Sequence, residues 1–248
     1  MTIQVVSNYL NDKVFHAVMI DSLQRGVSSI LAASSSGVLL RSTRTDVCMI
    51  SAANEETVHA MLAELDPNHC RLMIVHESFA IPIVEKKYNL TRHVKCVSSA
   101  YLGPGLPEID RPDLRIDRLG TDWVGWVCDH YAMDTPSYVR GRIEAGEVWG
   151  VFSGEQILGF IGLHEEGSMG MLVILEEHRR QGLAEYLVTF LTNSLLTQGR
   201  IPHDHIIVGN DASERLQRKM GFEISTRNLW WMTKGIRGPY SDIDTPVD

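Results

Sequence analysis

The sequence predicts a mixed α/β protein in two parts, and three observations support this. A short apolar run at 171–175 is followed by a glycine-containing loop and a helix-length segment with apolar residues at helical spacing. Strand and helix patterns also alternate through the first hundred residues. Finally, the richest Gly/Pro stretch lies at 102–107 and predicts a domain boundary, which gives domains at 1–106 and 112–234 and a polar tail at 235–248.

The first part gives strand and helix signals in turn, but it has no nucleotide-binding loop and no catalytic spacing. Apolar periodicity, capping residues and turn residues set the limits of the expected elements. In order, we expect helix within 5–25, a hairpin of strands at 38–42 and 47–51, a helix at 55–65 capped by Asn54, a strand at 71–75, a helix at 83–88 and a strand at 93–98.

The second part also gives strand and helix signals in turn. Thr121 and Asp122 are expected to cap its first helix, and Pro136 stands in the first turn of the next, where a missing N–H costs nothing. In order, we expect a strand at 114–119, helices at 121–131 and 135–145, a hairpin at 147–152 and 157–163, the central strand at 171–175, a helix at 183–195, a strand at 203–208, a helix at 211–219 and a closing strand at 222–233.

The composition is ordinarily globular, with 44% hydrophobic and 22% charged residues among 248. A net charge of −8 and the lack of a Lys/Arg run argue against a nucleic-acid partner. No apolar run approaches the roughly 20 residues of a membrane helix, and the N-terminus lacks a signal-peptide pattern. The four scattered cysteines have no metal-ligand spacing, so we expect reduced thiols, no metal site and a soluble cytoplasmic protein.

The most informative stretch is the loop between the central strand and the long helix. Gly182 is expected in the first helical turn, where it lets another group approach the backbone closely. The N–H groups at a helix start have no partner within the helix; here they belong to Gln181, Gly182, Leu183 and Ala184. Together with the helix dipole, Arg179 and Arg180, they predict a phosphate or pyrophosphate site.

Arg179, Gly182 and Ala184 resemble the acyl-CoA pyrophosphate loop of the GCN5-related N-acetyltransferase (GNAT) superfamily, whose pattern is Arg or Gln, two residues, Gly, one residue, and Gly or Ala. Asn210, the helix after it and the later Gly221-Phe222 are similar to the same family. The resemblance implies a GNAT fold in the C-terminal half, with a mixed, mostly antiparallel sheet flanked by helices. A smaller, degenerate GNAT-like α/β domain in front of it resembles the FR47-like, glycine N-acyltransferase-like branch.

The resemblance implies an enzyme that transfers an acyl group, most often acetyl, from coenzyme A to a primary amine. The acceptor would be a small-molecule amine or an amino acid. Asn210 would either bind the cofactor arm or cap the next helix. The pyrophosphate of acetyl-CoA would sit on the N–H groups of Arg180 to Ala184, and its pantetheine arm would hydrogen-bond the backbone of Leu172, Val173 and Ile174.

An alkyl amine with a pKa near 10.4 is mostly charged at neutral pH and needs a base before it can attack a thioester. His205 occupies the strand position, five residues before Asn210, where some family members carry a glutamate base. Glu166 and His164, at the entry to the central strand, are the rivals. Each of the three could instead be structural, as a satisfied strand histidine or part of a solvated turn.

The chain departs from the family pattern at two positions. Seven residues after Asn210, where many members have a tyrosine that protonates the leaving thiolate, the chain has Gln217, so another group or water must act, or the thiolate leaves unprotonated. Glu176 replaces a common proline. The missing acid keeps an alternative open, a non-catalytic acyl-CoA-binding sensor or interaction module, and a loop that binds some other phosphate is a third possibility.

Overall fold

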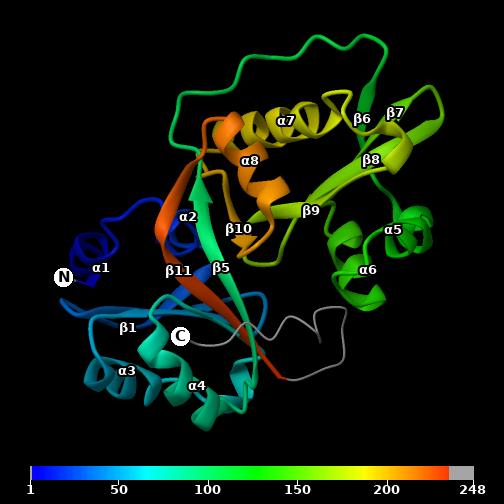
Figure 1. Ribbon diagram of the computed structural model, residues 1–248. Coiled ribbons are helices and arrows are strands. Elements are labelled where there is room, and N and C mark those ends of the chain that lie inside the picture. The colour runs from blue at the N-terminus through cyan, green and yellow to red at the C-terminus, as the bar shows by residue number, and fades with distance from the viewer. Residues whose placement is uncertain (1, 235–248) are drawn as a thin grey trace.

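The computed structural model describes residues 2–234, which form one sheet of 11 strands flanked by helices (Figure 1). The strand order is β1-β2-β3-β4-β11-β5-β10-β9-β8-β7-β6. Among the described strands, the β3–β4 and β9–β10 pairs are parallel and all others are antiparallel. This confirms the predicted mixed, mostly antiparallel α/β fold. The predicted tail at 235–248 lies outside the described residues.

The N-terminal half contains every element that its sequence predicts. Asn54 caps the helix after the hairpin, because its side chain accepts a hydrogen bond from the Thr57 N–H at 2.9 Å. One strand, β1, was not predicted. The elements are α1 (Thr2–Tyr9), α2 (Ala17–Gln24), β1 (Ser28–Ser34), β2 (Gly37–Ser42), β3 (Val47–Ala52), α3 (Glu55–Leu62), β4 (Leu72–Val75), α4 (Ile81–Tyr88) and β5 (Arg92–Ala100).

The C-terminal half follows its predicted order without an omission. Pro136 stands in the first turn of the second helix, as expected, and Thr135 caps it. Thr121 and Asp122 lie in a short 3₁₀ turn before the first helix and do not cap it. The elements are β6 (Arg115–Arg118), α5 (Val124–His130), α6 (Pro136–Glu144), β7 (Val148–Ser153), β8 (Gln156–Leu163), β9 (Met169–Ile174), α7 (Leu183–Thr197), β10 (His203–Ile207), α8 (Asp211–Lys219) and β11 (Glu223–Thr233).

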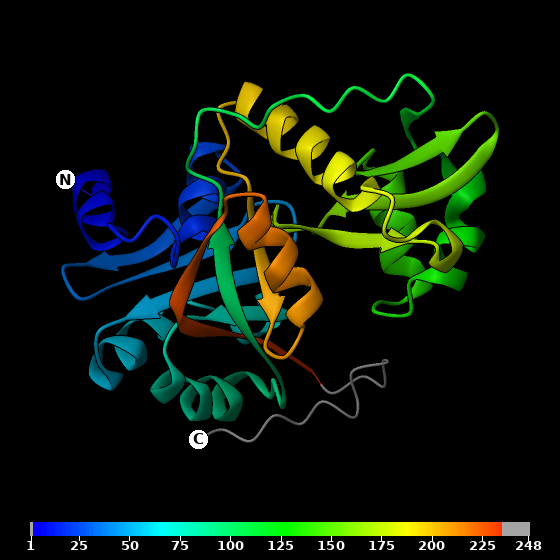
Figure 2. The same cartoon turned by 45° about the horizontal axis from the view of Figure 1, so that its top comes forward.

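Apart from β6, with which the C-terminal half begins, the two halves repeat one plan: two helices, three antiparallel strands, a helix, a strand, a helix and a final strand. Their final strands are exchanged. If each half were self-contained, β5 would lie beside β4 and β11 beside β10. Instead β11 lies between β4 and β5, and β5 pairs with β10. Figure 2 shows β5 and β11 running side by side between the halves.

The exchange joins the hydrophobic cores of the two halves. Leu229, Trp230 and Met232 of β11 pack in the clusters of the N-terminal half. The connection between β5 and β6 has no helix or strand, and Asn193 of α7 holds it by two hydrogen bonds to the Leu106 backbone, at 2.8 and 2.9 Å. The boundary predicted at 106–112 falls within this connection. Its division of the chain into two folding units remains a prediction, and the shared strands imply that the units fold together.

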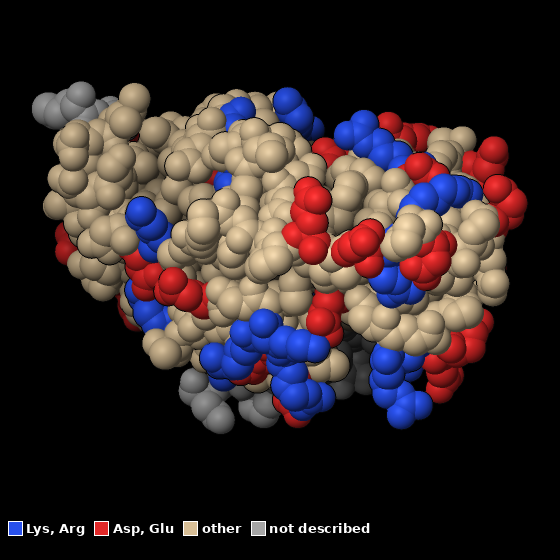
Figure 3. All heavy atoms as spheres, turned by 90° about the horizontal axis from the view of Figure 1, so that it is seen from above, with Lys and Arg blue, Asp and Glu red and all other residues tan. Residues whose placement is uncertain are grey.

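Within residues 2–234, no helix has the length and apolar character to cross a bilayer. The four cysteines are free thiols, and Cys48, Cys70 and Cys96 are buried, as expected. On the face shown in Figure 3, acidic and basic side chains of the described residues are interspersed. This face therefore has no single-signed field of the kind that attracts a polyanion.

Candidate active site

The central feature of the site is the separation of β9 from β10. These parallel strands share one paired position, Asp204 with Met169. The matching strands of the N-terminal half, β3 and β4, pair over four positions and stay closed. Beyond the shared position, β9 has no sheet partner on its β10 side among residues 2–234, and Met171, with φ of 50°, marks a bulge in it. The free edge of β9 can take up an extended ligand as an additional strand.

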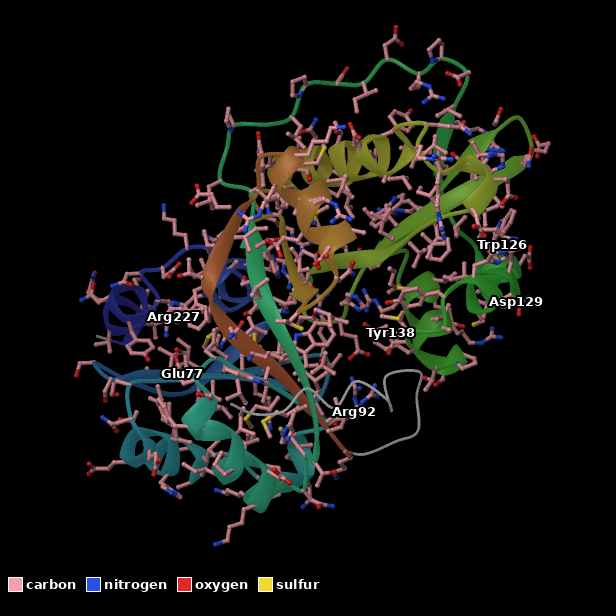
Figure 4. All side chains as sticks on the ribbon, viewed as in Figure 1. Glu77, Arg92, Trp126, Asp129, Tyr138 and Arg227 are labelled. Atoms are coloured by element: carbon pink, nitrogen blue, oxygen red, sulfur yellow. The ribbon has the colours of Figure 1, made fainter. Side chains whose placement is uncertain are left out.

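A cavity of about 800 Å³ opens between the separated strands. Both halves of the chain line it. Figure 4 shows Tyr138 of the C-terminal half and Arg92 of the N-terminal half, and both belong to its wall. The wall includes these predicted site residues: Leu172, Val173, Ile174, Arg179, Ala184, Asn210, His164, Glu166 and His205. The structure thus brings the predicted cofactor strand and all three predicted catalytic candidates to one cavity.

The predicted phosphate loop lies where β9 ends. Gly182 precedes α7 as its N-cap, with φ of 79°, instead of standing in the first turn as the sequence suggested. Arg180 also has a left-handed backbone, with φ of 61°. In the part of the chain that the structure describes, no side chain caps α7, and a Cβ placed on Gly182 would meet no atom within 4 Å. The start of a 15-residue helix therefore offers accessible N–H groups at its positive end.

The predicted loop residues differ in how they meet the cavity. The Arg179 side chain lines it and donates from Nε to the Ile174 carbonyl at 3.2 Å, which fixes it across the end of β9. Arg180, Gln181, Gly182 and Leu183 are not part of the wall; the first three are exposed and the Leu183 side chain is buried in the core. Their contribution to a ligand would come from backbone N–H groups.

Asn210 lies at the start of α8, another helix start that borders the cavity. Its side chain accepts a hydrogen bond from the Ser213 N–H at 3.1 Å and so caps α8. It also belongs to the cavity wall. The capping interpretation therefore describes what this side chain does here, and a contact with a bound ligand remains compatible with its position.

His205 has a defined tautomer. The Trp231 indole Nε1–H donates to His205 Nδ1 at 2.9 Å, and an indole nitrogen can only donate. The proton of the neutral imidazole must therefore be on Nε2, which is buried and has no hydrogen-bond partner among the described residues. Burial, together with the neighbouring His203, His76 and His164, lowers the pKa of His205 well below its usual value. His205, which lines the cavity, is thus a neutral imidazole with an unused N–H donor among the described residues.

Trp231→Phe is expected to free His205 from this tautomer. Without the indole donor, both ring nitrogens can carry a proton, and we expect the pKa of His205 to rise by about one unit or more. The ¹⁵N chemical shifts of the imidazole, followed through a pH titration, would show the change. The neighbouring Trp230→Phe, a change in the core of the N-terminal half, should leave these shifts unaltered. Unchanged shifts in Trp231→Phe would contradict the assignment.

His164 and Glu166 lie on the loop between β8 and β9, and both are buried. The Tyr138 hydroxyl hydrogen-bonds His164 Nδ1 at 2.8 Å, and burial lowers the pKa of this histidine. Ser168 Oγ donates to the Glu166 carboxylate. A carboxylate held in this way at the wall of the cavity can accept a proton from a bound ligand.

The loop is held by two arginines, one from each half of the chain. Arg25, the C-cap of α2, donates to the Glu166 carbonyl at 2.6 Å, and Arg200 donates to the Gly167 carbonyl at 2.9 Å. Asp21, fully buried on α2, pairs with both arginines, at 2.8 and 3.1 Å. This cluster fixes the backbone from which the Glu166 side chain enters the cavity.

Sequence reasoning missed several residues of the cavity. Asp204 lines it at the point where β9 and β10 separate, and burial raises its pKa to about 7. Asp134, in the loop before α6, also has a pKa raised to about 7, by burial and by the charges of Glu166 and Glu165. Arg71, which forms an ion pair with Glu165, comes from the N-terminal half. For Asp204 the sequence did give a signal, which is a charged residue inside the strand predicted at 203–208.

Comparison with known proteins agrees with this architecture. Residues 150–231 match the family described as FR47-like protein. No curated protein sequence matches the chain. Among solved structures, a Drosophila protein is similar with a TM-score of 0.60 at 11% identity, and the alignment covers 90% of this chain and 96% of that one.

Two further similar structures carry the GNAT name. A GCN5-related N-acetyltransferase-like protein from Streptococcus suis gives a TM-score of 0.53 at 11% identity, covering 93% of this chain and 98% of that one. A GNAT-family acetyltransferase from Colwellia psychrerythraea gives 0.50 at 15% identity, covering 94% and 96%. The resemblance of this chain to the GNAT superfamily, in its FR47-like branch, is confirmed by the family match and by the fold.

Proposed function

We propose that this chain is an acyl-CoA-dependent N-acyltransferase, with acetyl-CoA as the donor and a primary amine of a small molecule or amino acid as the acceptor. The observation that carries the proposal is the single paired position between β9 and β10. It opens a cavity with a free strand edge along one side and a glycine turn before a helix at its mouth. Candidate proton-transfer groups lie at the other end.

The residues present fit an acyl-CoA. The backbone of Leu172, Val173 and Ile174 would hold the pantetheine arm as an added strand. The N–H groups of Arg180 to Ala184, with the Arg179 side chain, would hold the pyrophosphate. Each charge-assisted hydrogen bond contributes about 1.5–3 kcal/mol, so several of them suffice without a metal ion.

At the acceptor end, we assign Glu166 as the base that removes a proton from the ammonium group of the acceptor. His205 retains the proton on Nε2 and would serve as a hydrogen-bond donor rather than as the base. His164 would orient the acceptor together with Tyr138. Arg71 and Arg92 line the same end, so the N-terminal half would contribute to acceptor binding.

One observation favours a second candidate, a non-catalytic acyl-CoA-binding module. Position 217, where a family tyrosine would protonate the thiolate, is a glutamine whose amide donates to Asp204. Such a module would bind acetyl-CoA through the same strand edge and loop. It would not release free coenzyme A with any amine.

A thermal-shift assay with acetyl-CoA, coenzyme A, ATP and NAD, followed by turnover on a panel of amines, tests the proposal. We expect both CoA species to raise the melting temperature, since a ligand at a hundred times its Kd adds about 2.7 kcal/mol of stability. Glu166→Gln should keep the acetyl-CoA shift and lower kcat about 10²–10⁴-fold, the usual share of a general base. Binding without turnover on any amine would favour the module, and no shift with either CoA species would exclude both.

A further inference from the structure

The residue at position 217 holds another side chain instead of supplying a proton. Gln217 is buried, and its Nε2 donates to Asp204 Oδ2 at 3.1 Å. An amide cannot release a proton near neutral pH, whereas the carboxyl group that it contacts can. Both side chains belong to the wall of the cavity, so a ligand in the cavity can reach the carboxyl group.

Asp204 stands at the closed end of the separated strands. It is the residue paired with Met169, and beyond this pair β9 and β10 diverge. From Met169 to Ile174, β9 rises about 17 Å, at roughly 3.3 Å per residue. A ligand held by its phosphates at the glycine turn and by its arm along β9 would therefore place its far end beside Asp204.

The surroundings of Asp204 keep a proton on it near neutral pH. Burial raises its pKa to about 7, the His205 backbone N–H and the Gln217 amide lower it, and the charge of Glu166 raises it. Cys96 of β5 is a further titratable neighbour, and burial raises its own pKa, so that it stays a neutral thiol. A carboxyl group whose pKa is raised in this way can act as a general acid near neutral pH.

We propose that Asp204 is the general acid that protonates the departing thiolate, with Glu166 as the base; the inference rests on the proposed function. The amine nitrogen bonds to the carbonyl carbon and the carbon–sulfur bond breaks. The sulfur keeps the bonding electron pair and takes the proton of Asp204. Of the two protons that the ammonium group loses, one leaves to solvent through Glu166 and the other restores the acid form of Asp204.

The first test needs no acceptor. Coenzyme A is bound to the wild type and to Asp204→Asn, which is isosteric and can still accept the Gln217 hydrogen bond, and thiol ionisation is followed by thiolate absorbance. In the wild type, the ionised Asp204 should oppose the thiolate. We therefore expect the pKa of the bound thiol to be about one unit lower in Asp204→Asn, a tenfold larger ratio of thiolate to thiol at a given pH. Asp122→Asn, an exposed change outside the cavity, should match the wild type.

The second test uses the best amine of the panel. A general acid acts only while it is protonated. On the alkaline side of the pH profile, the wild-type kcat should therefore be at its maximum at low pH and should fall as the pH rises through about 7, where Asp204 loses its proton. Asp204→Asn should lose about 10²–10⁴-fold in kcat at pH 6, keep the KM for acetyl-CoA within about threefold, and lose this alkaline limb.

The outcomes distinguish a failure of the proposed function from a failure of the assignment of Asp204 as the acid. If coenzyme A binds neither protein, the proposed function fails. If it binds both with the same affinity and its thiol titrates identically in both, the assignment of Asp204 is overturned while the proposed function stands. A full rate with an unchanged alkaline limb in Asp204→Asn would overturn it equally. Retained coenzyme A binding also shows that the variant is folded.

Discussion

Gly182→Asp is expected to weaken acetyl-CoA binding by about 100-fold or more, a loss of about 2.7 kcal/mol. The φ of 79° at this residue strains any side chain with a Cβ by about 1–2 kcal/mol. The new carboxylate would also cap the free N–H groups of α7 and set a negative charge where the pyrophosphate should lie. Because aspartate is a good capping residue, the protein should remain folded, and the loss should be confined to the ligand.

Two variants separate charge from strain. In Gly182→Asn, the new side chain has the same shape as aspartate, tolerates the left-handed conformation and carries no charge. We therefore expect this variant to lose only about tenfold in affinity for acetyl-CoA. Gly199→Asp is the matched control: Gly199 ends the same helix with φ of 69°, and a Cβ there would likewise meet no atom within 4 Å. Isothermal titration calorimetry would compare them. If Gly182→Asp and Gly199→Asp bind acetyl-CoA alike, the loop is not the pyrophosphate site.

The elements with strong periodicity and caps were predicted closely. The α8 helix runs over Asp211–Lys219 as expected, because Asn210 caps it and a charged sequence surrounds a narrow apolar side. The β1 strand was missed, because its Ser and Ala residues have little strand propensity of their own. It forms because β2 offers it a complete antiparallel partner. Its structure comes from pairing rather than from local sequence.

The exchange of final strands could not be predicted for a related reason. Both β5 and β11 have strand patterns, but no pattern in either one states which neighbour it will pair with. The observed arrangement puts Leu229, Trp230 and Met232 into the core of the N-terminal half. Such a choice is decided by packing between segments more than a hundred residues apart.

The same limit applies to the candidate site. Local sequence was sufficient to predict the phosphate loop, because the residues that supply its N–H groups, including the glycine, follow one another in the chain. The proton on His205 Nε2 depends on Trp231, which is 26 residues away in sequence. The role inferred for Asp204 depends on Gln217 and on burial by several elements. Chemistry that arises from contacts across the fold is not visible in a spacing pattern.

Asp21→Asn is expected to destabilise the protein by about 3–5 kcal/mol, as removal of one partner from a buried ion cluster does. The Asp21 side chain is fully buried, pairs with Arg25 and Arg200, and accepts from the Ile201 N–H at 3.2 Å. Burial alone would raise its pKa, but His203, Arg200 and Arg25 together lower it. Neutralisation would leave two guanidinium groups without their shared counter-charge.

The same change should lower kcat, because Arg25 and Arg200 would then hold the Glu166–Gly167 backbone less rigidly. Urea unfolding at pH 7 measures the stability, and Asp113→Asn, which breaks an exposed pair with Arg111, should leave the midpoint nearly unchanged. A carboxyl group whose pKa is lower in the folded protein stabilises the fold fully at pH values above its pKa in the unfolded chain, near 3.9. This stabilisation is lost as the pH falls through its pKa in the folded protein. The difference between wild type and Asp21→Asn should therefore narrow below about pH 4. A midpoint equal to that of the wild type at pH 7 would mean that the cluster does not fix the loop.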